Sequence, residues 1–111
     1  MNGYYKLKTT EGGKFRFNLH AGNHEVILTS QLYGDKGSAN NGIESVRANG
    51  PHEERFERKS SAKGEPYFLL KAANSQIIGT SEMYSSEAAR DNGIRSVMSQ
   101  SATETVKEED T

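Results

Sequence analysis

The feature that most constrains this chain is an internal repeat with a spacing of 51 residues. Residues 17–47 match residues 68–98 at 13 of 31 positions, and no gap is needed. The matches fall in three groups, which begin at Phe17, Thr29 and Asn41 in the first copy. Self-similarity at a fixed spacing indicates a duplicated structural unit. The chain therefore holds one small unit twice.

Each copy opens with three segments that are typical of strands. In the middle segment, Phe17 and Leu19 alternate with polar residues, which is the period of a half-buried strand. We expect tight turns after it, in which Asn23 and Asn74 adopt a positive φ. The expected strands cover residues 4–9, 15–21 and 26–29 in the first copy and residues 55–60, 68–72 and 76–79 in the second.

A helix follows the strands in each copy. Asp35 and Ser86 are suitable N-caps at equivalent positions. After them, apolar residues recur three apart on one face, beside a face of small residues that includes Gly42 and Gly93. The small face predicts close approach of the helix backbone to the sheet or to the other helix. The alternative is a ligand that touches the glycine.

These elements predict an α+β fold of tandem βββα repeats. One unit of about 50 residues buries too little surface to be stable alone. We expect the two units to pair about a pseudo-twofold axis into one antiparallel sheet, with both helices on one face. The expected segments of this one compact domain are residues 1–50, the first repeat; 51–102, a linker and the second repeat; and 103–111, a short edge strand and an acidic disordered tail.

Composition excludes several classes of protein. The chain has 111 residues, 14 basic against 15 acidic, and no cysteine. That length excludes a multidomain enzyme, and the missing cysteines exclude disulfides and thiolate metal sites. There is no long apolar run and no apolar signal core near the first residue. We therefore expect a cytoplasmic protein.

The repeated motifs resemble the YegP-like family of small, mostly bacterial proteins of uncharacterised function. The motifs are Phe-x-Leu-x-Ala-x-Asn (17–23 and 68–74), Thr-Ser-x-x-Tyr (29–33 and 80–84) and Asn-Gly-Ile-x-Ser-Val (41–46 and 92–97). The resemblance implies two β(3)-α units in a single sheet, with C-terminal strands exchanged between the halves. It also implies a monomer that contains its dimer internally. It carries no established activity, cofactor or catalytic residue.

The residues themselves indicate no catalytic, cofactor or metal site. His20, His24 and His52 lack partners at ligand spacing, so we interpret them as surface histidines. There is no P-loop and no dinucleotide motif. An enzyme would need a pocket, and no motif in this sequence indicates one. The main interpretation is a non-enzymatic interaction module of unknown partner.

Two groups of residues are candidates for binding. Strand alternation places basic and aromatic residues on the sheet face away from the helices, as in platforms for single-stranded nucleic acid. A plain solvated face and a protein-binding face are the alternatives. We expect the acidic C-terminal residues to compete for this face. The residues that we assign to the face are Tyr4, Lys6, Arg16, His20, Tyr67 and Lys71.

The second candidate is a small-ligand site at the loops that join strand to helix. Its residues recur in both copies. They are Ser30, Tyr33, Asn41, Ser81, Tyr84 and Asn92. The alternative is structural, with the hydroxyls capping backbone groups and the rings covering the start of the helix.

Overall fold

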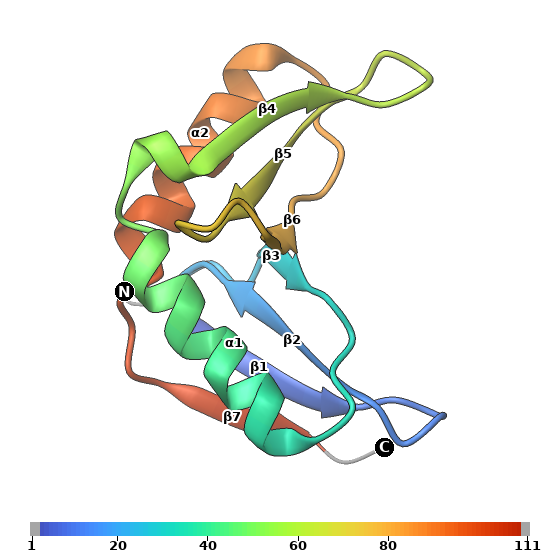
Figure 1. Ribbon diagram of the computed structural model, residues 1–111. Helices are drawn as coiled ribbons and strands as arrows, with labels where there is room; N and C mark the ends of the chain where they lie inside the picture. The colour runs from blue at the N-terminus through green and yellow to red at the C-terminus, as the bar shows by residue number, and fades with distance from the viewer. Residues whose placement is uncertain (1–2, 110–111) are drawn as a thin grey trace.

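The computed structural model describes residues 3–109 (Figure 1). The two copies have the same order of elements, and a short strand follows them. The first copy contains β1 (Tyr4–Thr9), β2 (Phe15–His20), β3 (Val26–Ser30) and α1 (Lys36–Asn49). A 3-10 turn, η1 (Glu53–Arg55), precedes the second copy, which contains β4 (Phe56–Ser60), β5 (Pro66–Lys71), β6 (Ile77–Thr80) and α2 (Glu87–Gln100). The last strand is β7 (Val106–Glu109).

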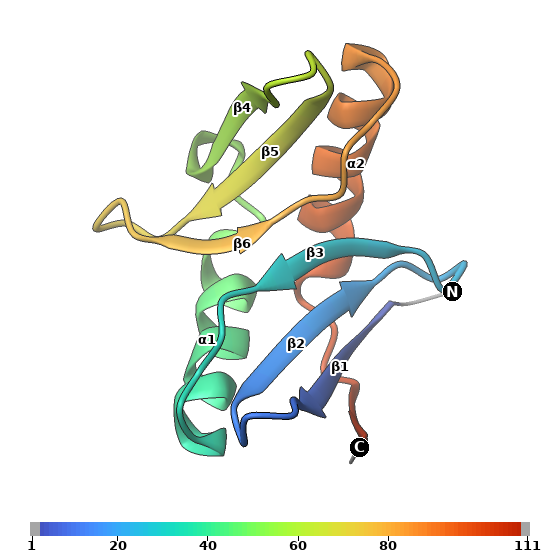
Figure 2. The same cartoon turned by 90° about the vertical axis from the view of Figure 1, so that its right-hand side faces the viewer.

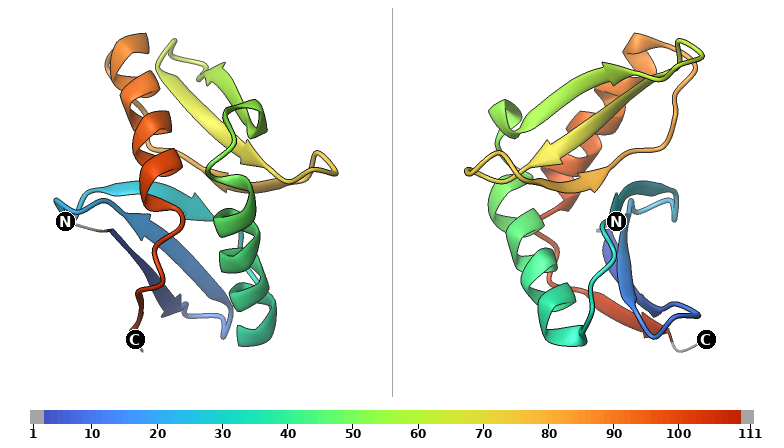
Figure 3. Two further views of the ribbon diagram at one scale, coloured as in Figure 1. Left: turned by 90° about the vertical axis from the view of Figure 1, so that its left-hand side faces the viewer. Right: turned by 45° about the vertical axis from the view of Figure 1, so that its right-hand side comes forward.

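The seven strands form one sheet in the order β4-β5-β6-β3-β2-β1-β7. Its centre is a short antiparallel ladder in which Thr29 lies opposite Thr80 and Ser30 opposite Gly79. A side chain on Gly79 would meet that of Leu28 from the first copy. Both helices cover the same face, as Figure 2 and Figure 3 show. The prediction of a tandem α+β domain is therefore confirmed.

The prediction of an entirely antiparallel sheet is wrong, because β7 runs parallel to β1. Glu108 and Glu109, which we expected in a disordered acidic tail, belong to this strand. Lysines of β1 and α1 pair with both carboxylates, so the acidic segment has partners that local sequence does not reveal. The rest of the expected tail, Asp110 and Thr111, lies outside the described residues.

The strand that follows each helix lies in the sheet beside the half of the chain that does not contain that helix. β1 and β4 are equivalent, because shifting residues 4–9 by 51 gives residues 55–60. β4 follows α1 and pairs with β5 of the second half. In the first half, β1 already occupies the position beside β2 that corresponds to the position of β4 beside β5. β7 therefore pairs with the outer edge of β1. Each strand that follows a helix thus lies against the other half.

The predicted alternation of the strands is confirmed. The side chains expected to face the helices are all buried, and they are Tyr5, Leu7, Phe17, Leu19, Phe68 and Leu70. The helices bury the apolar residues that recur three apart, which are Ile43 and Val46 in α1 and Ile94 and Val97 in α2. One core lies between the sheet and both helices.

Both predicted N-caps are confirmed. The Asp35 carboxylate accepts a hydrogen bond of 2.7 Å from the Ser38 backbone N–H. The Ser86 hydroxyl accepts one of 3.0 Å from the Ala89 backbone N–H. The hydrogen bond from Ser38 also lowers the pKa of the Asp35 carboxyl. Each helix therefore begins at a residue whose side chain satisfies an otherwise unpaired backbone donor.

The prediction for the turns after β2 and β5 is wrong by one residue. His24 (φ 72°) and Ser75 (φ 70°) occupy the left-handed region, and the asparagines before them do not. The Asn23 side chain instead accepts a hydrogen bond of 3.2 Å from the Glu25 backbone N–H. The asparagine stabilises the turn through its side chain, so the next residue takes the unusual backbone conformation.

The small helical face packs against an aromatic ring. A Cβ atom on Gly42 would lie 2.7 Å from Cζ of Tyr33, and one on Gly93 would lie 2.7 Å from Cζ of Tyr84. The predicted close approach is therefore real. The nearest partner is the tyrosine of the preceding loop. The next is a phenylalanine of the sheet, since the same Cβ atoms would lie 3.0 Å from Cε2 of Phe17 and 3.2 Å from Cε2 of Phe68. The approach is therefore to the sheet and to this loop, and not to the other helix.

Candidate binding face

The open face is the side of the sheet that neither helix covers, which Figure 2 presents to the viewer. Strand alternation brings to it the six residues predicted for a binding face. One row crosses the sheet in register through Asn18, Thr29, Thr80 and Leu69. The bases on its strands are Lys6, Lys8, Arg16, Lys59, Lys71 and Lys107, and the acids are Glu57 and Glu109. Six bases against two acids give the face a surplus of four positive charges.

Tyr4 and His20 form a ring stack at one end of the face. Their ring centroids are 4.7 Å apart and the planes differ by 5°. His20 Nδ1 donates a hydrogen bond of 3.0 Å to the His24 carbonyl, and His20 Nε2 is buried with no hydrogen-bond partner among the described residues. Lys107 of β7 places its Nζ 4.2 Å from the Tyr4 ring centroid. These two predicted residues therefore contact each other, and the Lys107 side chain covers the Tyr4 ring.

Two predicted lysines of the face are in ion pairs. Lys6 Nζ lies 3.1 Å from a Glu109 carboxylate oxygen, and Lys71 Nζ lies 2.5 Å from a Glu57 carboxylate oxygen. Hydrogen bonding to these lysines lowers the pKa of both carboxyls. Lys8 also approaches Glu109, at 4.0 Å.

Arg16 and Tyr67 are the two predicted residues without such pairing. Arg16 makes no ion pair with any residue of 3–109, and Tyr67 is half-buried. They hold equivalent positions in the two copies, on opposite sides of the central row. Three strand spacings and two residues of rise on each side put them about 20 Å apart. The six predicted residues thus form separate groups.

A shallow hollow lies where the second copy has no counterpart of the Tyr4–His20 stack. Arg55, Lys71 and Ser75 replace Tyr4, His20 and His24 there. The hollow has a volume of about 230 Å³, and these three residues line it together with Glu54 and Glu57. Arg55 Nε is buried and has no hydrogen-bond partner among residues 3–109. The sequence did not predict this hollow, because it forms only where residues of η1, β4 and the end of β5 come together in space.

The two serines of the predicted loop site bond to the backbone. Ser30 Oγ accepts a hydrogen bond of 3.0 Å from the Phe17 N–H and donates one of 2.7 Å to the Gln31 carbonyl. Ser81 repeats this arrangement with Phe68 and Glu82, at 2.9 and 2.8 Å. Both hydroxyls are buried and fully used, which favours the structural alternative.

The other loop-site residues have different surroundings in the two copies. Tyr84 and Asn92 line a groove of about 340 Å³ between α2 and the β2–β3 turn, together with Glu25 and Ser96. Asn41, the counterpart of Asn92, lies on α1, and both asparagines are exposed. The predicted residues therefore do not converge on one site. The groove lies between the halves, so neither copy's sequence could predict it.

Charge distinguishes the two tyrosine sites. Burial raises the pKa of Tyr33 and of Tyr84, and the carboxylates of Glu82 and Glu25 raise that of Tyr84 further. The residues equivalent to these two glutamates are Gln31 and Gln76. Of these two tyrosines, only Tyr84 therefore has carboxylates placed to raise its pKa.

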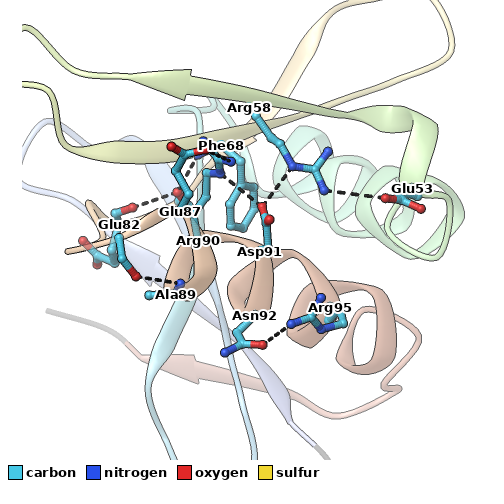
Figure 4. Close-up of polar contacts among 12 residues, drawn as sticks. Glu53, Arg58, Phe68, Glu82, Glu87, Ala89, Arg90, Asp91, Asn92 and Arg95 are labelled. Carbon is cyan, nitrogen blue, oxygen red and sulfur yellow. Dashed lines mark hydrogen bonds and ion pairs between the residues drawn. The ribbon is translucent and has the colours of Figure 1, made fainter.

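A polar network fastens β4 to α2 (Figure 4). Arg58 Nε donates a hydrogen bond of 2.9 Å to an Asp91 carboxylate oxygen, and this contact lowers the pKa of the Asp91 carboxyl. Arg90, which is only 8% exposed, donates to the same oxygen at 3.2 Å. Ala39 is the equivalent of Arg90 in the first copy. The network explains why a charged residue is buried in α2 alone.

The described residues hold neither a metal-type cluster nor a membrane-type helix. Within 3–109, no three His, Cys, Asp or Glu side chains gather as metal ligands would. No helix in that range combines the length and apolar character needed to cross a bilayer.

Comparison with known proteins assigns a family. The sequence model of the protein family described as "Domain of unknown function (DUF1508)" matches residues 11–57 and again residues 61–108. The chain belongs to the DUF1508 family. Each match begins before the second strand of a copy and ends in the strand after the helix, at β4 or β7. Each matched segment therefore contains two strands, a helix and at least the start of the strand that follows the helix.

Curated relatives of this DUF1508 protein are named only as uncharacterised proteins. A UPF0339 protein of Shewanella oneidensis is 56% identical over 108 residues, which cover 97% of this chain and 98% of the relative. The UPF0339 protein YegP of Escherichia coli K12 is 51% identical, again over 97% of this chain and 98% of the relative. The predicted YegP-like resemblance is confirmed.

Two solution NMR structures have the same fold. A UPF0339 protein from Shewanella oneidensis superposes with a TM-score of 0.92 at 55% identity, covering 99% of this chain and 93% of that one. The yegP protein of E. coli superposes with a TM-score of 0.93 at 50% identity, covering 99% and 95%. The latter is described as a protein of unknown function. The family thus establishes the fold, and its function is unknown.

Proposed function

We propose that this DUF1508 protein is a non-catalytic module that binds single-stranded nucleic acid on its open face. The observation that carries the proposal is the composition of that face, with six bases, two acids and aromatic rings. The phosphates of a nucleic acid bind to a basic surface, and its nucleobases stack on exposed aromatic rings whatever their sequence. The cytoplasmic location and monomeric state expected from the sequence accord with this role.

A binding role is favoured over catalysis by the engagement of the shared polar residues. The Ser30 and Ser81 hydroxyls each hold two backbone groups. The rings of Tyr33 and Tyr84 pack on glycines. Repeated residues with these roles maintain the fold, whereas a catalytic nucleophile needs a neighbouring base and a free approach.

Arg16 and Tyr67 are the residues that we expect to contribute most. Arg16 is exposed and has no ion-pair partner within residues 3–109, so binding a phosphate breaks no existing contact. Tyr67 offers a ring on the open face for a nucleobase. A strand of several nucleotides spans the distance of about 20 Å between them.

Fluorescence anisotropy with a labelled oligodeoxythymidylate at low salt tests the proposal. Tyr67→Ala should weaken binding by about one to two decades, because base stacking on one ring is worth about 1–3 kcal/mol. Tyr67→Phe keeps the ring and should bind as the unmodified chain does. Arg16→Gln should reduce the slope of log K against log salt by about 0.7.

Arg95→Gln is the matched control for charge, since Arg95 is exposed on α2, away from the open face. It should leave the salt slope unchanged. If the unmodified chain fails to bind at high micromolar concentration, the proposal is wrong. Capture of a nuclease-resistant protein partner that Arg16→Glu abolishes would identify the face as a protein interface instead.

A further inference from the structure

We infer that Lys6 and Lys8 form an anion-binding pair on the open face, which Glu109 of β7 occupies in the free protein and a phosphate of the bound strand takes over. This inference rests on the proposed function. It adds that the last strand of the chain masks part of the binding surface.

The geometry of the pair suits an anion with two oxygens. Lys6 Nζ lies 3.1 Å from Glu109 Oε2, and Lys8 Nζ lies 4.0 Å from Glu109 Oε1. One carboxylate therefore bridges two ammonium groups, each on a different oxygen. Two oxygens of a phosphate can make the same contacts. The lowered pKa of the Glu109 carboxyl agrees with this bridging.

Strand alternation sends adjacent acids of β7 to opposite faces of the sheet. Glu109 lies opposite Lys8 in the parallel ladder and points to the open face. Glu108 instead forms an ion pair with Lys36 at the start of α1, on the helix side. The two glutamates carry equal charge, and of the two only Glu109 contacts Lys6 and Lys8.

Displacing Glu109 would leave a continuous basic strip. Lys8 lies opposite Arg16 in the β1–β2 ladder. Lys6 and Lys8 alternate along the same strand and face the same side. Without Glu109, no carboxylate lies among these three basic side chains. An uninterrupted row of positive charge of this kind can bind successive phosphates of a nucleic acid backbone. In the second copy, Glu57 and Lys59 replace the two lysines, so the strip belongs to the first half.

β7 is attached weakly after residue 105 and firmly before it. Thr103 donates a hydrogen bond of 2.8 Å to the Gly3 carbonyl and accepts one of 3.0 Å from Arg47. The Thr105 carbonyl accepts one of 2.9 Å from the Tyr5 N–H. Beyond this point, the four residues of β7 rely on a short ladder, on the contact of Lys107 with the Tyr4 ring and on exposed ion pairs. Exposed ion pairs stabilise little. β7 can therefore leave β1 while residues 103–105 stay in place.

Substitution of the two glutamates separates masking from net charge. The probe is a fluorescein-labelled oligodeoxythymidylate of 12 nucleotides at low salt. Glu109→Gln keeps the shape of the side chain and should tighten binding by about fivefold, because the oligonucleotide no longer displaces an ion pair. Glu108→Gln removes the same charge on the helix side and should change the dissociation constant by less than about twofold.

Hydrogen exchange supplies a second readout. The backbone amides of Lys107 and Glu109 should exchange faster in the oligonucleotide complex than in the free chain, because displaced β7 loses its ladder. Slower exchange on binding would overturn the inference, as would equal tightening by both substitutions. If neither the unmodified chain nor Glu109→Gln binds, the proposed function is wrong as well. If the unmodified chain binds and Glu109→Gln has no effect, the inference alone is wrong.

Discussion

The Tyr5 hydroxyl donates a hydrogen bond of 2.5 Å to the carbonyl oxygen of Ser101, and both residues are fully buried. This contact joins the first strand to the C-cap residue that directly follows α2. Tyr5→Phe should destabilise the protein by about 1–3 kcal/mol at pH 7, because the Ser101 carbonyl loses its donor in a buried site. Urea denaturation followed by circular dichroism measures the change, and an unaltered midpoint would contradict it.

The same substitution should change how stability depends on pH. Burial raises the pKa of Tyr5 far above its ordinary value near 10. The stabilisation is therefore complete below pH 10, where the unfolded chain also keeps this proton, and declines as the pH rises further. At pH 11, the difference between Tyr5→Phe and the unmodified protein should narrow by about 1.4 kcal/mol. Denaturation at pH 7 and pH 11 tests this, and a constant difference would count against it.

A side chain at Gly42 should destabilise the fold even though alanine favours helices. The new Cβ would lie 2.7 Å from the Tyr33 ring, so the ring must shift. We expect Gly42→Ala to lower stability by about 1–3 kcal/mol through overpacking. Gly37 is the matched control in the same helix, since its Cβ would meet only an Asp35 oxygen at 3.4 Å. Gly37→Ala should be neutral or stabilising by up to about 1 kcal/mol. Thermal denaturation of both variants decides the matter, and equal effects would refute the packing argument.

Residues 1–50 should not fold as a monomer. α1 packs on β5 and β6 of the second half as well as on β2, and α2 packs on β2 and β3. A half-length chain loses these partners and is too short to replace them. Sedimentation velocity with circular dichroism should show an unfolded chain or a folded dimer. A folded monomer would demonstrate two separate cores.

The two equivalent tyrosines should titrate differently when Glu25 is altered. Glu25→Gln removes a negative charge near Tyr84 and copies the glutamine of the other half. The phenolate of Tyr84 then meets less repulsion, so its pKa should fall, whereas that of Tyr33 should not change. NMR titration of ¹³C-labelled tyrosine reports both residues in one sample. Equal shifts, or none, would show that Glu25 does not act on Tyr84.

The sequence predicted the features of the fold that depend on local residue patterns and on the internal repeat. Alternation assigned Phe17 and Leu19 to the core, and the short polar side chains of Asp35 and Ser86 marked the helix starts; all are confirmed. Because each pattern occurs twice, an interpretation made for one copy could be checked in the other copy. The motifs also indicated the family correctly.

Contacts between distant segments escaped prediction. The short edge strand expected within residues 103–111 is present, but its extension through Glu108 and Glu109 was not predicted. That extension brings the two acids to Lys6, Lys8 and Lys36, which lie far away in the sequence. The open face was assigned correctly by alternation, yet pairing by Glu57 and Glu109 depends on which strands become neighbours. The groove beside Tyr84 also arises only when the two halves meet.

The parallel pairing of β1 and β7 determines how this fold would respond to mechanical force. These are the first and last strands, and their ladder runs from Tyr5 opposite Val106 to Lys8 opposite Glu109. Tension applied at the two ends would pull the strands lengthwise past each other and load the whole ladder at once. Antiparallel neighbours at the ends would open bond by bond. While the ladder holds, force passes directly from β1 to β7, and everything between them is shielded from the load.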